Sequence, residues 1–102
     1  MLIPESLKVG PYEYRVVIVD DLHSSTDRNV ALFGEILYKP QEIRIRAGMG
    51  DGHRLSTLLH EVIHALDDEM YVIGLSEKQI KCLGVGLAAF LLDNGLLREE
   101  AE

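Results

Sequence analysis

The chain of 102 residues is 47% hydrophobic and 26% charged, a composition typical of a single soluble globular domain over residues 1–102. Its net charge of −7 argues against nucleic-acid binding, and it contains neither a signal-peptide pattern nor a segment long enough to span a membrane. Its single cysteine, Cys82, excludes an internal disulfide and a cysteine-based zinc site, so we expect a cytoplasmic protein.

Three segments in the first half of the chain have the composition of β-strands. Residues 12–19 are rich in β-branched and aromatic side chains, alternating at first and then continuously apolar, whereas residues 1–10 are expected to be a lead-in. Residues 32–38 and 42–46 flank a turn that contains Pro40, and we expect these two strands to form an antiparallel hairpin.

The last of these strands alternates cleanly between apolar and charged residues. We therefore expect Ile43 and Ile45 to face the core. Arg44 and Arg46 should then face the solvent on the opposite side of the sheet.

Two longer segments with helical periodicity follow. The first runs from residue 53 to residue 69 or 70, with Asp51 as the expected N-cap. Ser76 and Gln79 form a capping box that opens a second helix, which continues to about Asp93. The expected apolar stripe of this helix consists of Ile80, Leu83, Leu87, Phe90 and Leu91. Together these elements predict an α+β fold in which a small antiparallel three-stranded sheet packs on two long C-terminal helices.

The first helix contains an HExxH motif, which runs from His60 to His64. Residues i and i+4 lie one turn apart on the same helical face, so the two imidazoles can reach one metal ion. Glu61 lies at the flank of that face, where it can act on a water held by the metal. Two ligands and a general base in five residues are typical of a zinc-dependent hydrolase.

Catalytic zinc usually takes three protein ligands, so one more donor is needed. His53 is a poor candidate because it lies seven residues, or about 10 Å along a continuous helix, before His60. His23 occupies a loop that could fold back to the site. The best candidate is Glu77, which opens the second helix 13 residues after His64. On spacing alone, Glu77 is explained equally well as an acid that the helix dipole favours at a helix N-terminus.

Three further side chains lie near this face of the first helix. Asp67 and Asp68 follow His64 by three and four residues, so either could orient a ligating imidazole, and two solvated acids at a helix end explain them equally well. Tyr71 lies on the metal side and could stabilise an oxyanion, against the alternative of a packing or surface tyrosine.

Residues 57–67, which contain the motif, and the Leu-Ser-Glu-Lys-Gln segment at residues 75–79 carry a family likeness. Over roughly residues 10–95, the chain resembles the small phage and bacterial HExxH proteins related to the ImmA/IrrE-like metallopeptidases. The resemblance implies a minimal zincin-like core of the gluzincin type, in which a glutamate on the following helix completes the zinc site. This glutamate matches Glu77.

We therefore expect a zinc metallopeptidase that hydrolyses peptide bonds. His60, His64 and Glu77 would hold one Zn2+, and Glu61 would be the general base for the zinc-activated water. The expected partner is a peptide or protein substrate, such as a regulatory protein, that pairs with the edge of the strand at residues 42–46. The alternatives are a non-catalytic zinc-containing peptide-binding protein and a phage regulatory protein whose partner completes the site. The presence of Glu61, which a structural zinc site does not need, favours the enzyme.

Overall fold

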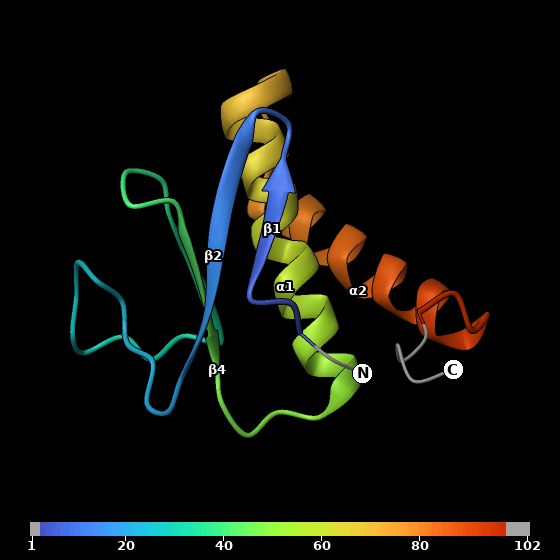
Figure 1. Cartoon of the computed structure of the whole chain (residues 1–102), viewed down its shortest axis with the longest axis horizontal. Coiled ribbons are helices and arrows are strands. Elements are labelled where there is room, and N and C mark those ends of the chain that lie inside the picture. Colours follow the sequence, from blue (N-terminus) through green and yellow to red (C-terminus); the bar gives the residue numbers. More distant parts are fainter. Residues whose placement is uncertain (1–2, 98–102) are drawn as a thin grey trace.

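The computed structural model describes residues 3–97, apart from the side chain of Tyr71. Four strands form one sheet, and the helices follow it in the chain (Figure 1). The strands are β1 (Ser6–Val9), β2 (Tyr12–Val19), β3 (Gly34–Leu37) and β4 (Glu42–Arg46). The helices are α1 (Asp51–Ala65), its π-helical continuation η1 (Leu66–Tyr71) and α2 (Glu77–Asp93). Helix α1 lies between the sheet and α2 (Figure 1), so its two faces contact different layers.

The sheet differs from the predicted antiparallel three-stranded one, and that prediction is wrong. The strand order is β1-β2-β4-β3, and β2 and β4 pair in parallel, which makes the sheet mixed. The expected lead-in supplies the fourth strand, because the chain turns at Gly10, whose φ is 59°, and pairs β1 with β2. The parallel pair sets Val16 beside Ile43, and this long-range match of two buried apolar residues leaves no local pattern in the sequence. The sheet and the two helices still make an α+β arrangement.

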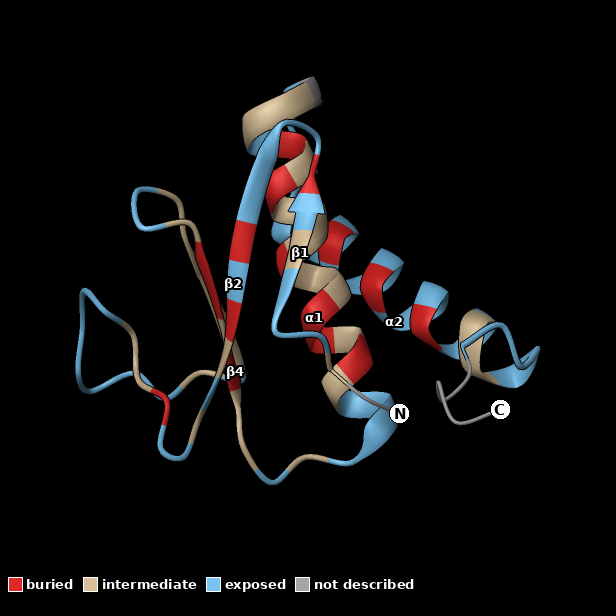
Figure 2. Ribbon diagram, viewed as in Figure 1, coloured by how far each residue is buried: buried red, intermediate tan, exposed pale blue. Residues whose placement is uncertain are grey.

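The predicted hairpin between the second and third expected strands is confirmed. Strands β3 and β4 pair antiparallel, with Ile36 opposite Ile43. Ile43 and Ile45 are fully buried, as predicted, and belong to the main core between the sheet and α1 (Figure 2). The other members of that core are Val9, Tyr14, Val16, Leu58 and Ala65.

Arg44 and Arg46 do not extend freely into solvent as expected. Both are half-buried, and Arg44 Nε donates to Glu42 Oε2 at 2.7 Å. Arg46 donates to the backbone carbonyls of Leu22 and Leu32, at 2.5 and 2.8 Å. Arg46 therefore anchors the long β2–β3 loop through charged hydrogen bonds and is not simply a solvent-exposed charge.

Helix α1 begins at Asp51, two residues before the predicted start at residue 53. Gly50 occupies the N-cap position without a side-chain hydrogen bond, and Asp51 is the first helical residue, so the predicted cap is wrong. The α-helical geometry ends at Ala65 and widens into η1, which Val72 ends in a left-handed conformation with φ 49°. Within residues 3–97, neither helix combines the length and the apolar character that a transmembrane span requires.

The predicted apolar stripe of α2 is only partly correct: its first member, Ile80, is buried, but the other buried residues of the helix are small. Ile80, Gly84 and Ala88 are buried, whereas Leu83 and Phe90 are exposed. A Cβ atom on residue 84 would lie 3.1 Å from the backbone oxygen of Ser56 and 3.4 Å from the amide nitrogen of His60. The helices therefore approach too closely for a large side chain, and the large residues turn outward.

This close approach gives a test of the packing. Gly84→Val should lower the free energy of unfolding by about 1–3 kcal/mol, because the added carbons meet the α1 backbone. Gly86→Val is the matched control, since a Cβ there would meet nothing within 4 Å and valine is no worse than glycine in a helix. Urea denaturation of both variants measures the difference, and equal stabilities would contradict this packing.

Candidate metal centre

Two histidines of α1 and the first residue of α2 converge on one point. Glu77 Oε1 lies 2.6 Å from His60 Nε2 and 3.1 Å from His64 Nε2. The donor atoms of the three residues all lie within 4.8 Å of one another. Burial raises the pKa of Glu77, but its hydrogen bonds with His64 and His60 outweigh that effect and lower it. The structure thus brings together the three residues that the sequence analysis selected as metal ligands.

The donor set suits a zinc ion. Two imidazole nitrogens and one carboxylate oxygen are among the ligands that zinc takes in catalytic sites, where three protein groups leave a position open. All three donors are close enough to share one ion, and each side chain is at least partly open to solvent. His60, His64 and Glu77 therefore fit the metal that the motif implies.

The start of α2 places Glu77 at this point. Ser76 accepts a hydrogen bond from the Gln79 amide at 3.1 Å, and the Gln79 side chain accepts one from the Ser76 amide at 2.8 Å. The predicted capping box is therefore present. From this cap, α2 runs back along α1, so that Gly84 reaches the level of Ser56. Glu77 is thereby held beside the C-terminal half of α1, next to His60 and His64.

Asp67 shapes the turn before α2 and does not orient a histidine. Its carboxylate accepts hydrogen bonds from the amides of Gly74, at 2.8 Å, and Leu75, at 2.9 Å. These bonds, the one from Gly74 above all, hold the pKa of Asp67 below its usual value despite the burial of the residue. Of the two roles considered for Asp67, orienter or solvated acid, neither describes what the structure shows.

Asp67→Asn should lower the thermal unfolding midpoint at pH 7 by about 5 °C or more, because an amide cannot accept both backbone hydrogen bonds. Because its pKa is lower in the folded than in the unfolded protein, the Asp67 carboxylate stabilises the fold fully at pH values above its unfolded pKa of about 3.9. This contribution is lost as the pH falls through the lower pKa of the folded state. The difference between variant and wild type should therefore shrink below about pH 4. Thermal melts with EDTA present measure the midpoints at each pH. Asp93→Asn, at an exposed position of α2, is the control. Equal unfolding midpoints of Asp67→Asn and wild type at pH 7 would refute the role of Asp67 in the turn.

Glu61, the predicted general base, is buried between α1 and β3. A Cβ atom on residue 34 would lie 3.1 Å from Glu61 Oε2 and 2.6 Å from Thr57 Cγ2, so only glycine lets the strand pass here. Burial raises the pKa of Glu61 to about 7, and the charge of His64 opposes that rise. The sequence analysis did not identify Gly34 as part of the site, since the close approach exists only in the tertiary structure.

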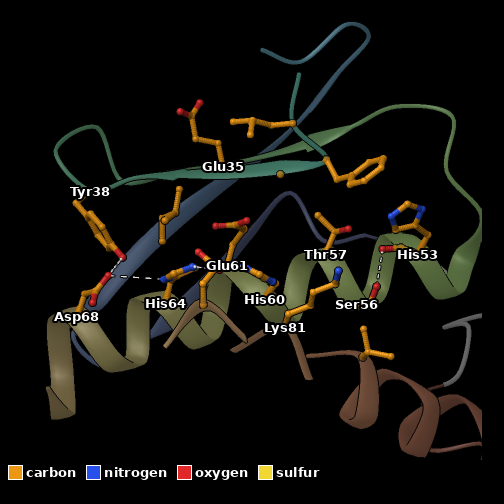
Figure 3. A pocket seen from close by; sticks show the side chains of 16 residues that line it. Glu35, Tyr38, His53, Ser56, Thr57, His60, Glu61, His64, Asp68 and Lys81 are labelled. Atoms are coloured by element: carbon orange, nitrogen blue, oxygen red, sulfur yellow. Dashed lines mark hydrogen bonds and ion pairs between the residues drawn. The ribbon is translucent and has the colours of Figure 1, made fainter. Parts of the chain in front are cut away.

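Of the two aspartates that follow the motif, Asp68 is the one that lies near a histidine of the site. Its Oδ2 atom accepts a hydrogen bond from the Tyr38 hydroxyl at 2.5 Å and lies 3.9 Å from His64 Nδ1, beyond hydrogen-bond distance (Figure 3). Tyr38 follows β3 and was not among the predicted residues. The side chain of Tyr71 lies outside the described residues, so its role as an oxyanion stabiliser stays a prediction.

The other two histidines lie away from the ligand group. His23 pairs with Ala31 in an isolated β-bridge of the β2–β3 loop, and its Nδ1 atom is 3.0 Å from the Asp21 carbonyl oxygen. His53 contacts the Phe33 ring with a centroid distance of 4.5 Å. Neither residue joins the cluster of potential ligands within residues 3–97.

A groove of about 740 Å³ opens over the three ligands (Figure 3). Strand β3 forms one side and α1 the other, and α2 contributes Glu77, Lys81 and Val85. The prediction that a substrate pairs with residues 42–46 is wrong in its choice of strand, because β4 has neighbours on both edges. Strand β3 is the terminal strand of the sheet on this side, and its outer edge has no strand partner among the described residues.

Comparisons with protein-family models, with curated proteins and with solved structures found no match for this chain. The likeness to the ImmA/IrrE-like metallopeptidases therefore stays a prediction.

Proposed function

We propose that this chain is a zinc-dependent metallopeptidase of the ImmA/IrrE-like kind, with zinc held by His60, His64 and Glu77. The observation that carries the proposal is the convergence of these three donors beside a buried glutamate, Glu61, in an open groove. When bound there, zinc supplies a Lewis acid that lowers the pKa of a water molecule and polarises a carbonyl group.

The residues of the chain supply the proton transfers. Glu61 takes the proton of the attacking water and delivers it to the leaving amine. Its position supports this role, because it lies on α1 directly after His60 and lines the same groove as the ligands. A site that held zinc only for structure would not need this carboxylate.

The substrate class is a peptide or a protein segment in extended conformation. Such a segment adds a strand to the open edge of β3, where main-chain hydrogen bonds hold it without regard to its sequence. The groove beside this edge is long enough to include both Tyr38 and Phe33, which lie at opposite ends of β3. Cys82 is a free, exposed thiol, in line with a reducing compartment such as the cytoplasm.

Metal content and cleavage together test the proposal. Purified protein equilibrated with zinc and then desalted should contain about one zinc per chain by elemental analysis. The same preparation should cleave a pool of synthetic peptides, lose this activity with 1,10-phenanthroline and regain it on addition of zinc. Protein that takes up no zinc would refute the proposal. Zinc uptake without cleavage would favour the alternative of a non-catalytic peptide-binding protein.

A further inference from the structure

Lys81 places a cation inside the groove. It lies on α2 one turn after Glu77, and in Figure 3 its side chain extends from α2 toward the groove that His60 and Thr57 also line. Within residues 3–97, the side chain of Lys81 has no hydrogen bond and no ion pair with another residue. Lysine on a surface helix normally extends into water, so a lysine that lines a groove without a partner is available for a ligand.

The carboxylates of the groove do not serve as partners for this lysine. Glu77 faces the two imidazoles, and Asp68 accepts the Tyr38 hydroxyl. Glu35 accepts two hydrogen bonds from Ser25, one from its amide and one from its hydroxyl. Glu61 is buried beneath β3, and none of the four lies within ion-pair distance of Lys81.

We propose that Lys81 binds a carboxylate of the substrate and thereby makes this site selective for peptides with an acidic group about two residues from the hydrolysed bond. The proposal rests on the proposed peptidase function and names its substrate class. The carboxylate comes either from an Asp or Glu side chain or from the free C-terminus of the peptide. Both present the same chemistry to the ammonium group.

The spacing sets where the acidic group lies. Lys81 is four positions after Glu77 in the helix, a rise of about 6 Å along α2. An extended peptide advances about 3.3 Å per residue, so the carboxylate belongs about two residues from the bond at the metal. Phe33 and Val85, which are exposed and line the same groove, provide apolar contacts around the ion pair. Such contacts reduce its screening by water.

Cleavage-site profiling tests the inference. Wild-type protein, Lys81→Met, Lys81→Glu and the control Lys78→Met are incubated with zinc and randomised 12-residue peptides, which carry either a free carboxylate or a carboxamide at the C-terminus. Lys78 lies on the same helix but does not line the groove. Wild type and Lys78→Met should cut about 3- to 10-fold more often at bonds with an acidic group at one fixed position nearby. Lys81→Met should lose this preference, and Lys81→Glu should shift it toward Lys and Arg.

The two peptide pools separate the two sources of the carboxylate. A preference that disappears in the carboxamide pool assigns the chain terminus, and one that persists assigns Asp and Glu side chains. Cleavage by wild-type protein without any acidic preference overturns the inference while the peptidase function stands. A preference that Lys81→Glu leaves unchanged overturns it as well.

A binding measurement keeps the inference testable if nothing is cleaved. Fluorescence anisotropy with the Glu61→Gln protein compares two labelled peptide pools that differ only in Glu or Gln at the central position. The Glu pool should bind about 3- to 10-fold more tightly, and Lys81→Met should abolish the difference. Equal affinities of the two pools would overturn the role of Lys81, whether or not the protein is a peptidase.

Discussion

Glu61→Gln is expected to reduce peptide hydrolysis by about 10²- to 10⁴-fold or more, while the protein keeps its zinc. The substitution preserves the size and shape of the side chain but removes the group that accepts the proton of the attacking water. The fold should persist, because a buried carboxylate whose pKa burial raises to about 7 is already poorly stabilised as an ion, and a neutral amide suits that position. Initial rates on a peptide substrate and the zinc content of the same sample measure the two effects separately.

Two controls make this prediction specific. Glu5→Gln is the same chemical change at an exposed residue that does not line the groove, and it should leave the rate unchanged. A circular dichroism melt of Glu61→Gln shows whether the variant is folded. Full activity in a zinc-loaded, folded Glu61→Gln protein would contradict the assignment of the general base.

Glu77→Ala should lower the affinity for zinc more than about 100-fold, because loss of only an outer partner of a ligand already lowers affinity about 10- to 100-fold. The variant removes the single carboxylate that faces both imidazoles, so His60 and His64 would have to hold the ion alone. Competition with a fluorescent zinc chelator measures the affinity directly.

The neighbouring residue of α2 supplies the control for this variant. Lys78→Ala changes the same first turn of the helix without touching the ligand cluster, and it should bind zinc as wild type does. Wild-type affinity in Glu77→Ala would show that zinc, if bound, takes its third ligand elsewhere. The helix should persist in both variants, since its capping box does not include either position.

Local hydrogen-bond geometry explains which elements and site residues were predictable. The four-residue spacing of His60 and His64 sets both imidazoles on one helical face in any α-helix, whatever surrounds it. The cap at Ser76 and the strands at residues 12–19 and 42–46 likewise depend on short-range patterns, and the structure has all of them.

The remaining features were decided by contacts between segments far apart in the chain. The parallel pairing of β2 with β4 and the exposed edge of β3 follow from the strand order, which no short-range pattern specifies. The outward turn of Leu83 and Phe90 follows from how closely α2 approaches α1 at Gly84.

The site divides in the same way. The sequence by itself determined that two histidines and Glu61 share one stretch of α1, because helical periodicity acts within a few residues. Only the tertiary structure decided that Glu77 meets those histidines, and that Tyr38 and Lys81 line the groove. These side chains come from separate elements, and they meet only because the sheet and the two helices pack together. That packing depends on the apolar surface buried and the strands paired over the whole chain, and not on any short segment.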